Sequence, residues 1–256
     1  MIEKLYSWLL PVARRTLGAP AALFTLLLVA AAPGVALGEE SAPVWEEGVN
    51  YERLPIPVAT SSPDKVEVVE VFSYACIHCM HFEPTVAAWE ETLPSYVAFV
   101  RMPATFNASW ATLAQGYYTA EALGVVDKVH EPMFEAIHNQ RINLTDPKLM
   151  AELFEREAGV SEAQFNQVFN SFSVRSRVQQ ADARGRAYRI TGTPTMVVDG
   201  TFRVDGRMAG SNADMMRVVD YLVEQQRALR GISADATVPA IDPPAAAAAS
   251  GTEEAH

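Results

Sequence analysis

The 256-residue sequence has few basic residues and only two cysteines. Lys and Arg number 20 against 31 Asp and Glu, which gives a formal net charge of -11, and the longest basic run is the pair Arg14-Arg15. Recognition of nucleic-acid phosphates needs a concentrated Lys/Arg surface, so we expect no nucleic-acid binding. The excess of acidic residues favours a self-repelling, monomeric protein.

The scarcity of cysteine also limits what a disulfide could do for stability. Cys76 and Cys79 lie three positions apart, so a bridge between them closes only a four-residue loop. The chain-entropy relation gives such a loop about 2 kcal/mol, which a chain of this size does not need. The pair is therefore interpreted as reactive.

The N-terminus has the order of a secretory signal peptide over residues 1–38. A positively charged segment is followed by an apolar run over 19–32, and the small residues of Ala36-Leu37-Gly38 precede two acids. This order predicts export and cleavage. An uncleaved membrane anchor is the alternative, because the apolar run is near the lower limit for a membrane span.

The rest of the chain predicts an α/β fold interrupted by helices, without internal repeats. A short edge strand broken by prolines is expected over 51–60 and a central strand buried on both faces over 65–74. A helix over 76–93, kinked at Pro84, precedes a third strand over 96–102. Helices are then expected over 108–123, 131–139, 146–158, 162–169 and 174–188, strands over 195–199 and 201–204, and a last helix over 212–230.

The segment Cys76-Ile77-His78-Cys79 carries the predicted chemistry. A C-x-x-C at a strand–helix junction puts its first cysteine where free N–H groups and the helix dipole favour an anion. This lowers the pKa of Cys76 and makes it the nucleophile, while Cys79 is the resolving thiol. His78 is expected to stabilise the Cys76 thiolate further, which would make the disulfide oxidising.

Metal binding is the main rival interpretation of this segment. Cys76, His78, Cys79 and His81 form a dense group, but no second C-x-x-C or H-x-x-x-H follows. Haem attachment needs a histidine directly after the second cysteine, where Met80 stands. We therefore predict neither a metal nor another cofactor.

Glu70 is the remaining candidate within the apolar strand. It lies six residues before Cys76 and is either a surface acid or a buried carboxylate that transfers the proton of Cys79. Pro194 directly precedes a predicted strand, where an ordinary strand-entry proline would be trans.

An ordered set of motifs resembles the DsbA family of thiol:disulfide interchange proteins, from about residue 47 to residue 230. The motifs are Glu47-Gly48, Glu70-Val71-Phe72-Ser73-Tyr74, Cys76-Ile77-His78-Cys79, Leu123-Gly124-Val125, Asn170-Ser171-Phe172 and Gly192-Thr193-Pro194-Thr195-Met196. The resemblance implies a thioredoxin fold interrupted by an inserted all-helical domain. It also implies a cis Pro194 packed against the disulfide, with the backbone of Thr193 pairing with substrate.

The order of predicted elements and the resemblance agree on the expected domains. The thioredoxin-like domain would occupy residues 39–106 and 176–230 and the helical insertion 107–175, and the Ala- and Pro-rich composition of residues 231–256 predicts a disordered tail. The resemblance also implies a periplasmic location, reduced secreted proteins as substrates and a quinone-linked membrane oxidase as reoxidant.

Two departures from the family pattern keep the direction of reaction open. Ile77 replaces the usual proline, and Thr193 stands where a valine is common in the oxidases, whereas threonine also occurs in isomerases. We favour an oxidase because the segment before residue 65 is too short for an isomerase's dimerisation domain. A reductase, an isomerase and a thiol-bearing chaperone are the alternatives.

Overall fold

The computed structural model describes residues 45–234 and places five strands and eight helices in them. The predicted signal peptide and nearly all of the predicted tail lie outside these residues. The strands are β1 (Glu52–Arg53), β2 (Val66–Phe72), β3 (Val97–Pro103), β4 (Thr195–Val198) and β5 (Phe202–Asp205). The helices are α1 (Ile77–Glu90), α2 (Ala108–Leu123), α3 (Val126–His138), α4 (Pro147–Ala158), α5 (Glu162–Phe169), α6 (Phe172–Ala187), α7 (Gly206–Ala209) and α8 (Asn212–Arg230).

The strands form one mixed sheet in the order β1-β5-β4-β2-β3. The central strand β2 runs parallel to β3 and antiparallel to β4, and all seven of its residues are buried. Valine-rich strands of this kind suit a position covered on both faces. The predicted doubly buried strand is confirmed.

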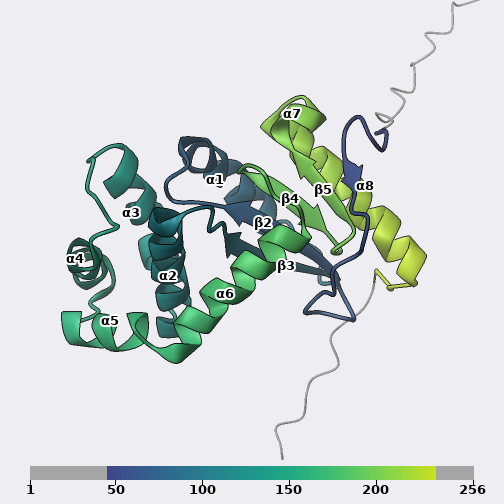
Figure 1. The fold of residues 1–256 in the computed structure, drawn as a ribbon. Coiled ribbons are helices and arrows are strands. Elements are labelled where there is room, and N and C mark those ends of the chain that lie inside the picture. The colour runs from purple at the N-terminus through teal and green to yellow at the C-terminus, as the bar shows by residue number, and fades with distance from the viewer. Residues whose placement is uncertain (1–44, 235–256) are drawn as a thin grey trace, which may run out of the picture. The chain divides into compact units, whose positions relative to one another are not determined.

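Alternate residues of β2 face two different hydrophobic clusters. Val66 and Val68 pack with residues of α1 and α8, such as Phe82 and Leu222. Val69 and Val71 pack with the helices that lie between β3 and β4 in sequence. Figure 1 shows α2, α3, α4 and α5 gathered beside the sheet, with α6 leading back to it. The α/β fold with a helical insertion is therefore as predicted.

Local capping explains most of the helix boundaries. The Asn107 side chain accepts a hydrogen bond from the Trp110 N–H at the start of α2, and Gly124 ends that helix in a left-handed conformation. Ser161 and Gln164 form the predicted capping box of α5.

Four elements differ from the prediction. Helix α3 begins at Val126 instead of 131, so Pro132 lies inside the helix and not in its first turn. Helix α6 begins two residues earlier than predicted, at Phe172, because Ser171 caps it. The edge strand β1 has only two residues, and the short helix α7, capped by Asp205, was not predicted.

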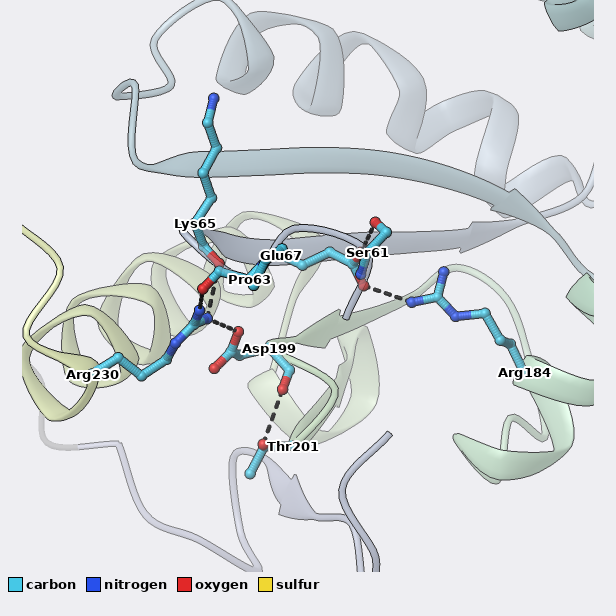
Figure 2. Close-up of polar contacts among 8 residues, drawn as sticks. All are labelled: Ser61, Pro63, Lys65, Glu67, Arg184, Asp199, Thr201 and Arg230. Carbon is cyan, nitrogen blue, oxygen red and sulfur yellow. Dashed lines mark hydrogen bonds and ion pairs between the residues drawn. The ribbon is translucent and has the colours of Figure 1, made fainter. Parts of the chain in front are cut away.

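A group of polar contacts connects the sheet to α6 and α8 at the start of β2 (Figure 2). The buried carboxylate of Glu67 accepts hydrogen bonds from the Ser61 N–H at 2.8 Å and from Arg184 of α6 at 2.6 Å. Arg230, the last residue of α8, binds the Lys65 carbonyl at 2.8 Å and the Asp199 carboxylate at 2.5 Å. The contact with Arg184 gives the buried carboxylate of Glu67 the charged partner that burial requires. Among residues 45–234, no helix is both long and apolar enough to cross a membrane.

Candidate active site

The strand-to-helix connection after β2 places Cys76 at the N-terminus of α1. Cys76 is the residue before the first turn of α1, and its backbone is extended, with φ of -99° and ψ of 111°. Its N–H donates to the Ser73 carbonyl, and its own carbonyl accepts from the Cys79 N–H at 3.1 Å. Cys76 is half-buried and Cys79 is fully buried, and both are thiols in this structure. The first thiol can therefore be reached from outside, and the second cannot.

The two thiols have opposite affinities for a proton. The contact with the Cys79 thiol lowers the pKa of Cys76 to about 5, and the Thr193 hydroxyl and the backbone N–H groups of Cys79 and His78 act in the same direction against partial burial. Burial raises the pKa of Cys79 far above its ordinary value, and the neighbouring Cys76 adds to this. One thiolate with one thiol is thus the stable form of the reduced pair.

The loop before β4 completes the surroundings of the pair. The Thr193–Pro194 peptide bond is cis, as the resemblance implied. The Cys76 thiol lies 3.4 Å from the Thr193 carbonyl oxygen, to which it can donate. The Thr193 hydroxyl is buried and has no hydrogen-bond partner among the described residues, and its proximity lowers the pKa of both thiols. The three predicted residues Cys76, Thr193 and Pro194 therefore come together.

His78 acts on Cys76 through its backbone. Its backbone N–H helps to lower the pKa of Cys76, whereas its exposed side chain lines a groove of about 380 Å³ beside Thr193 and Pro194. The charged residues Asp205 and Arg207 line the far side of this groove. The groove runs from the active-site helix to the start of α7.

Glu70 is buried, with only 1% of its surface exposed, so the surface interpretation is wrong. It shares the strand face of Val66 and Val68, against which α1 packs. Burial and the neighbouring Glu83 raise the pKa of Glu70 to about 8, although Arg101 opposes them. The surroundings of Glu70 therefore favour its protonated form.

Three functional candidates escaped the sequence analysis. Arg101 of β3 is paired with Glu70 in the sheet register and lies 3.4 Å from its carboxylate, and it also binds Glu83 of α1 at 2.9 Å. His130 of α3 lies 3.2 Å from Glu83. Arg101 could have been noticed as the only charge in an apolar strand, but nothing local marks Glu83 or His130. In the described part of the chain, no three His, Cys, Asp or Glu side chains are grouped to hold a metal ion.

The chain resembles known proteins over most of the described region. Residues 95–223 match the family model of the DSBA-like thioredoxin domain. The thiol:disulfide interchange protein DsbA of Pseudomonas aeruginosa is 42% identical over 184 residues, which cover 72% of this chain and 87% of that protein. That of Bordetella pertussis is 39% identical over 205 residues, which cover 80% of this chain and 97% of that protein.

Solved structures agree with these matches. The crystal structure of Pseudomonas aeruginosa DsbA aligns with a TM-score of 0.71 at 41% identity, over 73% of this chain and 97% of that one. The oxidoreductase DsbA from Xylella fastidiosa aligns with a TM-score of 0.67 at 36% identity, over 73% of this chain and 98% of that one.

Proposed function

The chain belongs to the DsbA family and is a thiol:disulfide oxidoreductase, and from this premise we propose that it donates a Cys76–Cys79 disulfide to newly secreted proteins. The observation that carries the proposed direction is the contrast between the two thiols: the pKa of Cys76 is lowered to about 5, and that of Cys79 is raised. A reduced pair that is stable as thiolate and thiol makes its disulfide a strong oxidant.

The reaction proceeds through a mixed disulfide. A substrate thiolate attacks the Cys76 sulfur, the Cys76–Cys79 bond breaks, and Cys79 leaves with the electron pair. A second substrate thiolate then attacks the substrate sulfur of the mixed disulfide and expels Cys76 as a thiolate, which its low pKa makes a good leaving group. The substrate loses two electrons to the cysteine pair and gains a disulfide.

Glu70 supplies the proton that the first step requires. Cys79 leaves as a buried thiolate whose pKa is raised, so it must be protonated at once. Glu70 is protonated at neutral pH, because burial and Glu83 raise its pKa to about 8. It gives its proton to Cys79 during substrate oxidation and takes it back when the pair is reoxidised.

The groove beside Pro194 holds the substrate chain. The Thr193 backbone pairs with the extended substrate next to Cys76, and the His78 side chain contacts it from the α1 side. The polar lining by Asp205 and Arg207 suits polar segments of an unfolded chain.

The proposed location and partners follow from the N-terminal sequence and the family. The chain is exported to the periplasm through cleavage after about residue 38 of the sequence and works there as a monomer, and a quinone-linked membrane oxidase regenerates its disulfide. Its domains are a thioredoxin-like part over residues 39–106 and 176–230 with the helical insertion 107–175. N-terminal sequencing of the protein from the periplasmic and the membrane fractions tests the cleavage, because an intact Met1 in the membrane fraction would indicate an anchor.

The deciding experiment is equilibration of the cysteine pair with glutathione buffers to obtain its reduction potential. Reference potentials are about -120 mV for a DsbA and about -270 mV for thioredoxin. We expect a value near the first. A value near the second would replace disulfide donation by a reductase or isomerase function.

A further inference from the structure

His130 belongs to the helical insertion, yet its imidazole joins two parts of the active site. Its Nδ1 lies 2.8 Å from the Tyr74 hydroxyl oxygen, and its Nε2 lies 3.2 Å from a carboxylate oxygen of Glu83. Tyr74 precedes Cys76 by two residues, and Glu83 follows Cys79 by four. His130 is only 7% exposed and packs among aromatic rings, namely Phe72, Tyr74, Tyr117 and Phe134.

The imidazole of His130 has a polar group at each ring nitrogen. Nδ1 is within hydrogen-bond distance of the Tyr74 hydroxyl, whose pKa burial raises. Nε2 contacts the Glu83 carboxylate, although among the described residues neither Nε2 nor the contacting oxygen has hydrogen-bond geometry with any partner. His130 therefore connects Tyr74 to Glu83 across the active site.

Glu83 is also one of several acidic residues around the guanidinium of Arg101. Arg101 contacts three carboxylates: Glu90 at 2.7 Å, Glu83 at 2.9 Å and Glu70 at 3.4 Å. Glu70 has the longest of the three contacts, and within residues 45–234 neither of its oxygens has a hydrogen-bond partner. Burial raises the pKa of Glu83, but its contacts with His130 and Arg101 together bring this pKa below its ordinary value. The contact with His130 has the larger effect of the two.

We propose that His130 is a positioning residue of the active site: by holding the charged Glu83 on Arg101, it leaves Glu70 as the uncharged carboxyl group beneath α1. This inference deepens the proposed function and rests on it where Glu70 is the proton donor to Cys79. The titratable and charged groups around the imidazole are Tyr74 after β2, Glu83 of α1 and Tyr117 of α2, with Arg101, Glu70 and Glu90 beyond Glu83. The helical insertion would thereby control the proton supply of the thioredoxin-like part.

The substitution His130→Phe tests this directly, because it keeps the aromatic packing and removes both nitrogens. Without its contact to His130, Glu83 is expected to bind a proton more readily, and Arg101 then becomes available to Glu70. An opposite charge at close range lowers a carboxyl pKa by about 1–3 units, so the Glu70 titration should move down by about one pH unit or more. The measurement is carboxyl carbon NMR of the reduced, full-length protein against pH.

Glu83→Gln gives a second test that leaves α3 intact. It should move the Glu70 titration in the same direction, and the double variant with His130→Phe should add little, because both act through one contact. His138→Gln is the matched control, since His138 binds the Tyr74 carbonyl at 2.8 Å from the same helix. We expect it to leave the Glu70 titration in place.

The outcomes separate this inference from the proposed function. An unchanged Glu70 titration in His130→Phe, or in Glu83→Gln should His130→Phe not fold, overturns the positioning role. A shifted titration with an unchanged pH–rate profile of substrate oxidation supports that role of His130 and overturns the role of Glu70 as proton donor. A shift in both, in the same direction, supports the two together.

Discussion

The acidity of Cys76 makes the stability of the reduced protein depend on pH. The folded-state pKa of Cys76 is lowered to about 5, whereas an unfolded thiol has a pKa near 8.5. Folding therefore favours the thiolate, and the stabilisation is complete above about pH 8.5 and lost as the pH falls toward about 5. The disulfide form has no such group, so it serves as the reference.

The expected size follows from the two pKa values. A gap of about 3.5 pH units at about 1.4 kcal/mol per unit sets an upper limit near 5 kcal/mol. Cys76 is only half-buried, so solvent screens its charge, and we expect about half of that limit, or 2–3 kcal/mol. Over the two pH units from about 6 to about 8, the reduced form should gain about 1–2 kcal/mol on the oxidised form.

Urea unfolding of both redox forms at several pH values measures this gain, and the ultraviolet absorbance of the thiolate reports its titration independently. Cys76→Ser removes the titrating group, so its stability should not show the extra pH dependence. The reasoning is refuted if the difference between the two redox forms stays constant from about pH 6 to about pH 8 while thiolate appears only near the ordinary pKa of about 8.5.

Three further substitutions, the last with a matched control, test other features of the protein. Thr193→Val removes a hydroxyl that lowers the pKa of the nucleophilic thiol, so its thiolate titration should move up by about one pH unit, measured by absorbance. Arg184→Met leaves the buried Glu67 unpaired and should cost about 3 kcal/mol in urea unfolding. Gly200→Ala should cost more than about 2 kcal/mol, because the new Cβ would lie 1.9 Å from a backbone oxygen, whereas Gly159→Ala, with a similar φ but open space, should cost about 1 kcal/mol.

The parts of the site that sequence could predict are those encoded by neighbouring residues. A valine-rich run followed by C-x-x-C at the start of a helical pattern fixes the position of Cys76 without any distant contact. The burial of Glu70 follows from its place in that run, because all residues of a strand covered on both faces are buried. Pro194 was identified through the family resemblance, and its cis bond agrees with it.

What the sequence could not predict arises from contacts across the fold. His130 is one histidine in an amphipathic helix, and only the docking of α3 against α1 brings it to Glu83. That His78 acts through its backbone could not be predicted for a related reason, since the start of α1 allows its N–H to lower the pKa of Cys76. The early start of α3 was not predicted because no capping side chain marks it: Val125 precedes the helix without a side-chain hydrogen bond.

The two departures from the family pattern bear differently on the direction of reaction. Ile77 lies at the first position of α1 and is 39% exposed, and a proline there would also leave the N–H groups of His78 and Cys79 available to Cys76. Thr193 adds a buried hydroxyl that lowers the pKa of the Cys76 thiol, so it favours the reduced pair and an oxidising disulfide. By lowering the pKa of Cys76, Thr193 changes the site in the direction expected for an oxidase. The threonine that the family resemblance associates with isomerases is therefore compatible with the proposed disulfide donation.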